Sequence, residues 1–467
     1  MSNASASMLA VSYFLLSLGR WILVLVDNLI SPFRRTPRVD FYHCDDSARS
    51  KADAFDLGEL VASRVPSLRK GFQEAWWLPI GDTQTIYSAI GDFSAVDPVV
   101  YDRKFVQTVD GGILALDITP PLHSHPIRNG ELVIAVAHGL TGGSHEHYVR
   151  AALTRLCAPV EAGGLGARAV VLNFRGCNGT PVITPRLYHA GSSDDYRTCV
   201  AYVSHTFPQS TILGLGFSLG ANILSKYLGE EGIHCPLTGA AVLANPWNFR
   251  RGSDHIEFGT LANRYVYRFV MGGALQTLYK LHRKSFFDAS HEYNVDLEGI
   301  RMALEHPKPS LKEFEALTSA PMFGFKDADH YYTSISSSRV LDNVRVPLLG
   351  LNARDDPMVA DVTLPLSEVK QNPWVVLAVT PGGGHMGWFE QREDGTVGRW
   401  YPQPLAEYFN AIIEAGLPPR PKVDLVLDED GWVRQPGRDD VAFLERGPET
   451  LDLVVSGMGE SKLLSGF

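Results

Sequence analysis

Three side chains of the types used in covalent catalysis lie far apart in this chain, in the order Ser218, Asp356 and His385. A serine hydroxyl attacks a carbonyl carbon efficiently only when an adjacent base removes its proton, and histidine is the usual base. A carboxylate that binds the second ring nitrogen orients the histidine and stabilises the imidazolium that forms. The three residues therefore predict nucleophilic attack by Ser218 on a carbonyl.

Ser218 is the centre of the motif GFSLG at residues 216–220. The apolar run Thr211–Phe217 is typical of a buried strand, and the apolar spacing over Ala221–Leu228 is typical of a helix. A strand, a sharp turn and a helix form a nucleophile elbow, in which a strained backbone holds the serine hydroxyl clear of the sheet. The two glycines avoid side-chain collisions across the bend.

Two aspartates compete for the role of the acid. The predicted strand Val346–Leu351 runs into Asp355 and Asp356, and a carboxylate just after this strand fits the chain order Ser, Asp, His. The register counted from the start of the strand favours Asp356. Asp355 would then cap the loop or form a salt bridge nearby.

His385 lies in a glycine-rich loop, Gly382–Gly387, directly after the last predicted strand, Trp374–Thr380. Glycines allow such a loop to turn sharply and to bring the histidine back to the serine. We therefore expect His385 to be the general base.

A second glycine-rich turn, HGLTGG at residues 138–143, follows the predicted strand Glu131–Ala137. A turn in this place supplies one backbone N–H of the oxyanion hole in enzymes that have a nucleophile elbow. We expect the amides of Leu140 and Leu219 to be the two oxyanion donors.

Alternating strand and helix patterns predict an α/β fold with a mostly parallel central sheet and helices on both faces. The core is expected over residues 101–245 and 339–416. The alternation stops over residues 246–338, which are helical and aromatic and are predicted to form a cap insert over the sheet. The aromatic side chains would either line an acyl pocket or form the cap's own core.

Residues 1–40 are predicted to be an N-terminal membrane-anchor segment, because Met8–Ile30 is apolar and long enough to span a bilayer. Three arginines within residues 34–38 follow it and favour a catalytic domain in the cytosol. The alternatives are a helix lying in the membrane interface and a helix covering an apolar groove of the protein. Residues 41–100 are predicted to be an N-terminal extension and residues 417–467 a C-terminal extension.

The composition excludes several classes of protein. The net charge is −10 and no long basic cluster occurs, which argues against nucleic-acid binding. Five cysteines without a C-x-x-C pair indicate neither a disulfide framework nor a zinc site. We expect no metal and no organic cofactor, because side chains and backbone amides can supply the base, the nucleophile and the oxyanion donors.

Several motifs in order resemble the α/β-hydrolase group often called the AB hydrolase 4 family. They are WLP (77–79) with QT (84–85), HGLTGG (138–143), NFRGC (173–177), RLYH (186–189), GFSLGAN (216–222), NARDDP (352–357) and GGH (383–385). Together they cover about residues 76–415. One departure is Asp82, where the family pattern usually has a histidine.

The resemblance implies an α/β-hydrolase fold and a serine carboxylic-ester hydrolase acting on medium- or long-chain acyl esters, similar to membrane-anchored esterases and phospholipases. It also implies an alternative, an acyltransferase of the ethyl-ester synthase type, because water and an alcohol attack the same acyl-enzyme. A catalytically inactive membrane scaffold is the alternative from another class. The expected partners are a lipid or acyl-ester substrate and a membrane.

Overall fold

The computed structural model describes residues 38–44, 55–288, 293, 295–392 and 394–451. The segment Met8–Ile30, predicted to be the anchor, lies outside the described residues. Within the described ranges, no helix combines the length and apolarity needed to cross a bilayer.

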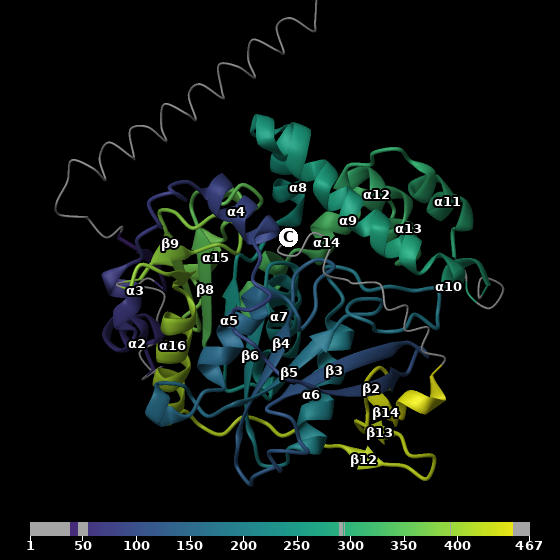
Figure 1. Ribbon diagram of the computed structural model, residues 1–467. Helices are drawn as coiled ribbons and strands as arrows, with labels where there is room; N and C mark the ends of the chain where they lie inside the picture. Colours follow the sequence, from purple (N-terminus) through teal and green to yellow (C-terminus); the bar gives the residue numbers. More distant parts are fainter. Residues whose placement is uncertain (1–37, 45–54, 289–292, 294, 393, 452–467) are drawn as a thin grey trace, which may run out of the picture.

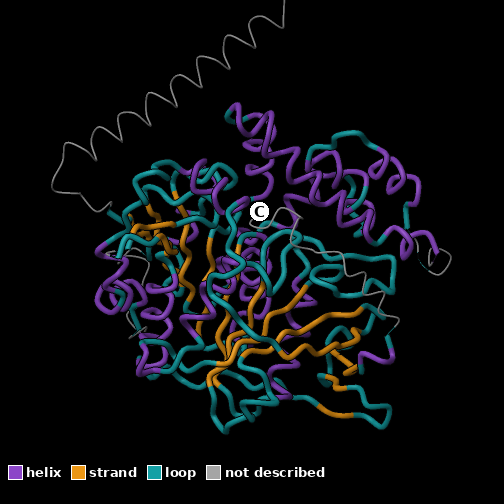
Figure 2. Tube along the Cα trace, viewed as in Figure 1, coloured by secondary structure: helices purple, strands orange, loops and turns teal. Residues whose placement is uncertain are grey.

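A single large sheet organises the described part of the chain (Figures 1 and 2). Its strand order is β1-β9-β8-β7-β6-β4-β5-β3-β2-β14-β13-β12. The six central strands, from β9 to β5, run parallel to one another, and antiparallel strands are added on both sides. The strands are β1 (Asp40–Tyr42), β2 (Asp102–Thr108), β3 (Ile113–Thr119), β4 (Leu132–Ala137), β5 (Arg168–Asn173), β6 (Thr211–Phe217), β7 (Gly239–Leu243), β8 (Leu348–Ala353), β9 (Val375–Thr380), β12 (Val426–Leu427), β13 (Val433–Arg434) and β14 (Ala442–Arg446).

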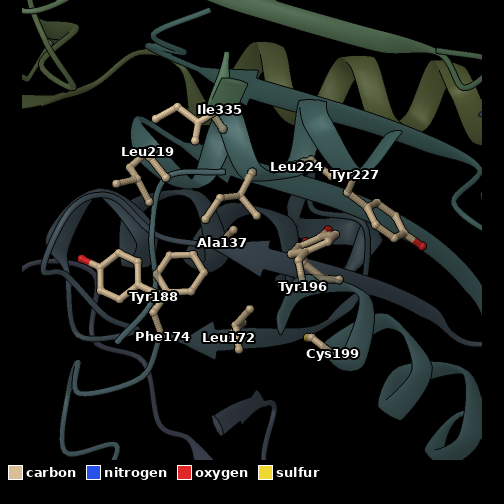
Figure 3. Packing of buried hydrophobic residues seen from close by; sticks show 14 of the residues in the cluster. Ala137, Leu172, Phe174, Tyr188, Tyr196, Cys199, Leu219, Leu224, Tyr227 and Ile335 are labelled. Atoms are coloured by element: carbon tan, nitrogen blue, oxygen red, sulfur yellow. The ribbon is translucent and has the colours of Figure 1, made fainter. Parts of the chain in front are cut away.

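The central strands are buried on both faces, as their continuous apolar runs predict. In β4, Val133 and Ala135 belong to one hydrophobic cluster, whereas Ile134 and Val136 belong to the cluster on the opposite face. This alternation follows from the two-residue period of a strand. Figure 3 shows the first cluster, where side chains of β4 and β5 meet those of the helices that cover them.

Helices cover both faces of the sheet. One face carries α6 (Ser193–Thr206) and α7 (Leu219–Glu231), and the other carries α2 (Leu57–Arg64), α5 (His147–Leu156) and α16 (Pro402–Glu414). This arrangement confirms the predicted fold class. The shorter elements nearby are α3 (Pro66–Lys70), α4 (Gly81–Ile90), α15 (Leu366–Val369), the 3-10 turns η1 (Val160–Ala162), η2 (Gly232–His234), η4 (Ser337–Asn343), η5 (Asp361–Thr363) and η6 (Pro448–Thr450), and the two-stranded sheet of β10 (Phe389–Gln391) and β11 (Val397–Arg399).

The described elements of the segment between β7 and β8 are all helices or helical turns, joined by loops, and they gather on one side of the molecule, at the upper right of Figure 1. The segment fills the interval predicted for the cap. Its elements are α8 (Phe249–Phe258), the π-helical turn η3 (Asn263–Tyr267), α9 (Arg268–Leu281), α10 (Arg283–Asp288), α11 (Leu297–Glu305), α12 (Leu311–Leu317), α13 (Ser319–Met322) and α14 (Ala328–Ile335).

The C-terminal segment is part of the sheet, which the sequence pattern did not indicate. Strand β14 pairs antiparallel with β2, and β13 and β12 continue the sheet beyond it. Arg438 in the same segment forms an ion pair with Glu231 at the end of α7, at 2.9 Å. The predicted C-terminal extension therefore packs against the core.

Candidate active site

Ser218 stands at the turn between β6 and α7, with φ +49°. A non-glycine residue rarely adopts a positive φ, and such strain persists only where the surroundings enforce it. A Cβ on Gly216 would lie 2.7 Å from the Ala221 Cα, across the bend as expected. A Cβ on Gly220 would instead lie 2.3 Å from the His138 carbonyl oxygen, which belongs to the neighbouring strand exit.

The three predicted side chains meet at this turn. The His385 Nε2 lies 2.8 Å from the Ser218 Oγ, and the His385 Nδ1 lies 2.8 Å from the Asp356 Oδ2. His385 is 1% exposed and Ser218 8%, so bulk water has little access to either bond. In this arrangement the histidine donates to Asp356 through Nδ1 and accepts the serine hydroxyl proton at Nε2.

The two competing aspartates have different partners. The other oxygen of Asp356, Oδ1, accepts backbone N–H groups from Met358 at 2.8 Å and Val359 at 2.9 Å. Asp355 accepts the Gly384 N–H at 3.0 Å and does not hydrogen-bond to His385. Burial raises the pKa of Asp355 to about 7. The carboxylate that contacts the histidine is therefore Asp356, and Asp355 holds the loop that carries the histidine.

The histidine loop is held by α4, from the N-terminal extension. The Thr85 hydroxyl accepts the His385 N–H at 2.8 Å, and the Gln84 side-chain oxygen accepts the Phe389 N–H at 2.7 Å. The Ser88 hydroxyl donates to the Met386 carbonyl at 3.3 Å. In the sequence, Gln84 and Thr85 are marked only by the family resemblance, which does not indicate their positioning role. Their presence in a motif outside the core was the available signal.

The amide of Leu140, an expected oxyanion donor, differs from the amides on either side of it. The Gly139 N–H donates to the Tyr148 hydroxyl and the Thr141 N–H to the Tyr188 hydroxyl, each at 2.8 Å. Of these three consecutive amides, only that of Leu140 has no acceptor among the described residues. Leu219 begins α7, where a helix leaves its first N–H groups without an intrahelical acceptor.

His138 is a structural residue beside this turn. Its Nδ1 donates to the Gly139 carbonyl at 2.7 Å, and its Nε2 accepts the Phe174 N–H at 3.2 Å. Complete burial lowers the pKa of His138 to about 3, so the ring is neutral and links the exits of β4 and β5.

Ser218 and His385 line a cavity that lies between the sheet and the cap. Leu140 and Leu219 line it together with apolar cap residues such as Ile256. The space open to water-sized molecules is about 80 Å³, whereas ligand pockets usually measure roughly 300–1,000 Å³. A medium or long acyl chain therefore requires cap side chains or helices to move apart.

The residue that departs from the family pattern joins the extension to the cap. Asp82, in the first turn of α4, accepts a hydrogen bond from the Tyr267 hydroxyl at 2.7 Å. The local packing at this position is therefore built on a tyrosine–aspartate contact.

The molecule also has a larger surface hollow of about 810 Å³, lined by charged residues including Asp97, Arg155 and Arg392. Its lining contains no serine, cysteine or histidine, so it has no serine–histidine or cysteine–histidine pair of the kind found beside Ser218. In the part of the chain that the structure describes, no group of three or more His, Cys, Asp or Glu side chains is arranged to hold a metal ion.

The model of the alpha/beta hydrolase family matches residues 133–399, which is more than half of the chain. The chain belongs to the alpha/beta hydrolase family.

Three similar members of the family have named activities. A "Monoacylglycerol lipase" of Saccharomyces cerevisiae is 29% identical over 415 residues, covering 80% of this chain and 89% of the relative. "Phospholipase ABHD3" of Homo sapiens is 30% identical, covering 77% and 83%. "Medium-chain fatty acid ethyl ester synthase/esterase 2" of Saccharomyces cerevisiae is 27% identical, covering 78% and 92%.

These alpha/beta hydrolases share ester chemistry on lipids, and the protein is a serine hydrolase of the lipase and esterase type. A catalytically inactive scaffold does not fit these findings.

Proposed function

We propose that the protein hydrolyses medium- to long-chain acyl esters through an acyl-enzyme on Ser218. The observation that carries this proposal is the continuous hydrogen-bonded chain from the Ser218 Oγ through His385 to Asp356. The apolar lining of the adjoining cavity, including Leu140, Ile256 and Met271, supports an apolar acyl group as the part of the substrate bound there.

In the first half-reaction, His385 Nε2 takes the hydroxyl proton as the Ser218 Oγ bonds to the ester carbonyl carbon. The negative oxygen that forms accepts the Leu140 and Leu219 amides. When the carbon–oxygen bond to the alcohol breaks, His385 returns the proton to the leaving alcohol. Water then attacks the acyl-enzyme by the same steps, releasing the fatty acid and free Ser218.

The test is labelling with a fluorophosphonate, together with hydrolysis of p-nitrophenyl esters from acetate to laurate. We expect wild type to be labelled and to turn over the longer esters faster, and Ser218→Ala to do neither. Equal labelling of both proteins would refute the role of Ser218. Fastest turnover of the acetate ester would refute the acyl-length part of the proposal.

An alcohol that replaces water in the second half-reaction would give a new ester. The relative named as an ethyl ester synthase/esterase supports testing this acyl transfer, whereas the lipase and phospholipase names support hydrolysis as the main reaction. Ethyl decanoate formed from p-nitrophenyl decanoate in added ethanol would establish the transfer. Decanoic acid as the sole product would rule it out under those conditions.

We also propose that the protein associates with a membrane through Met8–Ile30, with the catalytic domain in the cytosol. Exposed apolar side chains support contact with a lipid surface. They lie on α4 and on the cap, which pack against each other through Ala89, Ile256 and Tyr267, and α4 and α8 share one end of the molecule (Figure 1). The exposed residues are Ile86, Ile90, Phe258, Tyr265 and Val266.

Carbonate extraction of membranes from cells that express the full chain tests this part. Retention in the pellet supports a spanning anchor, and release from the pellet supports peripheral binding. Recovery in the first soluble fraction, before carbonate is added, would refute membrane association.

A further inference from the structure

The cavity that contains Ser218 is covered on one side by α8. The α8 residues that line it have the spacing of one helix face; they are Phe249, Gly252, Ser253, Ile256 and Glu257. Ser253 and Glu257 are the polar members of this set and stand one helical turn apart. An otherwise apolar helix face therefore presents two polar groups to the cavity.

Each of these two side chains carries a buried atom without a hydrogen-bond partner among the described residues, Ser253 Oγ and Glu257 Oε1. Glu257 is 8% exposed, and its second oxygen, Oε2, accepts a hydrogen bond from Arg268 at 2.9 Å. Arg268 therefore balances the charge of the Glu257 carboxylate. The Oε1 atom is still an unpaired acceptor, and leaving a buried acceptor without a hydrogen bond costs free energy.

Ser253 also differs from other hydroxyl residues in the helices of this protein. Ser63, Ser204, Thr277 and Thr333 each donate to the carbonyl four residues earlier, at 2.7 to 2.8 Å. This back-bonding is the usual way for a helical hydroxyl to be satisfied. Ser253 makes no such bond within the described structure, so its hydroxyl can both donate to and accept from a ligand in the cavity.

The charged residues elsewhere in the cavity lining already have partners. Lys312 pairs with Asp329 at 2.6 Å. Glu315 accepts hydrogen bonds from Tyr331 at 3.1 Å and from Tyr332 at 2.6 Å. Among the described lining residues, the unpaired polar side-chain atoms therefore lie together on α8.

We infer that Ser253 and Glu257 form a subsite for a free hydroxyl on the alcohol part of the ester, which makes partial esters of a polyol such as glycerol the favoured substrates. The inference rests on the proposed ester hydrolysis at Ser218. A substrate hydroxyl donates to Glu257 Oε1 and accepts from Ser253 Oγ–H. A quaternary ammonium group in the alcohol part of a substrate would not satisfy Glu257 Oε1, because it has no N–H or O–H to donate. Its positive charge is also not needed there, because Arg268 already balances the charge of the carboxylate. A simple alkyl ester leaves both side chains unpaired.

The test compares kcat/KM for monodecanoylglycerol with kcat/KM for propyl decanoate, using the full chain in detergent. The two esters share the acyl group and a three-carbon alcohol, and only the first has free hydroxyls. We expect wild type to prefer the glycerol ester by at least tenfold. Ser253→Ala, which removes no existing bond, should lower this ratio several-fold, and Glu257→Leu should lower it further, because hydrogen bonds to charged groups are the stronger ones.

Asp254→Asn is the matched control. Asp254 lies on the same helix, but its side chain is 52% exposed and pairs with Arg250, so the ratio should stay at the wild-type value. The Ser253→Ala/Glu257→Leu double variant should hydrolyse the two esters at nearly equal rates.

A wild-type ratio near one, or a ratio unchanged in both single variants, would overturn the inference while leaving ester hydrolysis intact. Loss of turnover of propyl decanoate as well as of the glycerol ester in Ser253→Ala would also overturn it, because the residue would then not discriminate between alcohols. Failure of wild type to hydrolyse either ester would instead refute the proposed function, and the inference with it.

Discussion

The serine turn and the histidine loop meet at one hydrogen bond, but they are built in different ways. The turn is built mainly by its own segment: β6 leads in, α7 leads out, and Gly216 removes a side chain that would collide with the Ala221 backbone across the bend. The loop depends on a distant segment, because Thr85 accepts the His385 N–H and Gln84 bonds to Phe389. One half of the site is thus encoded locally and the other half by contacts some 300 residues apart in sequence.

This difference explains why a short motif suffices to find the nucleophile, whereas the base is found only by its place in the chain. It also predicts different consequences of mutation. Changes in the turn should lower both the stability of the fold and the activity, and changes in α4 should weaken catalysis by misplacing His385.

The largest effect on turnover should come from the carboxylate that contacts the histidine. Asp356→Asn removes the charge that stabilises the imidazolium, so kcat should fall by about 10⁴-fold. Asp355→Asn, one residue earlier, should cost about tenfold or less, because Asp355 binds backbone N–H groups such as that of Gly384, whereas the histidine ring bonds to Asp356. Steady-state kinetics on p-nitrophenyl decanoate distinguishes the two, and equal losses would contradict the assignment of Asp356.

The serine turn can be broken without touching a catalytic side chain. Gly220→Ala places a methyl group 2.3 Å from the His138 carbonyl oxygen and 2.4 Å from that of Ala137. Backbone atoms cannot move aside easily, so we expect a loss of about 1–3 kcal/mol in the free energy of unfolding and at least a hundredfold loss of kcat/KM. Urea titration and ester hydrolysis measure the two quantities. Wild-type activity in this variant would show that the turn tolerates a side chain.

The distant support of the histidine loop predicts an intermediate effect. Thr85→Val keeps the shape of the side chain but leaves the buried His385 N–H without its acceptor, which costs roughly 1–3 kcal/mol. We expect kcat to fall about tenfold with little change in KM, while Thr85→Ser restores most of the activity. A Thr85→Val variant with wild-type kcat would show that the loop is held without α4.

The smallest effect concerns the pH dependence of stability. Burial raises the folded-state pKa of Asp355 to about 7, above its unfolded value of roughly 4. The folded chain therefore holds an extra proton between these values, and stability declines as the pH rises through this window. Asp355→Asn has no carboxyl group at this position and so removes the decline. The Tm of the variant minus the Tm of wild type should therefore increase by a few degrees between about pH 4 and pH 7.

Differential scanning fluorimetry across that pH range gives the measurement. Asp424→Asn, at an exposed position, is the control and should follow wild type. Parallel curves for wild type and Asp355→Asn would contradict the burial argument.

Much of the fold could be predicted from the sequence, because fully buried parallel strands appear as continuous apolar runs. The expected strand Thr211–Phe217 matches β6 in full, and the expected strand Trp374–Thr380 differs from β9 by one residue. The expected strand Val346–Leu351 is shifted by two residues toward the N-terminus relative to β8, at both its first and its last residue. Apolar composition does not reveal where hydrogen bonding between strands starts and stops.

The site could be predicted only in part. Ser218, His385 and Asp356 follow from chain order and from the turns around them. The roles of Thr85 in holding His385 and of Tyr148 and Tyr188 in occupying the amides beside Leu140 depend on three-dimensional contacts between distant segments. Strands β12 to β14 were not predicted because they are short: β12 and β13 have two residues each and β14 has five, so none has the longer apolar run that marks the central strands.

The addition of β14 to β2 has a practical consequence for engineering this protein. A truncation after α16 would keep all the family motifs, but it would also remove β14. The backbone N–H and C=O groups of β2 along Phe105–Thr108 would then lose their partner strand and be exposed. Unpaired strands of this kind act as templates for aggregation. Shortened versions should therefore precipitate or self-associate during purification, even though every residue that takes part in ester cleavage is still present.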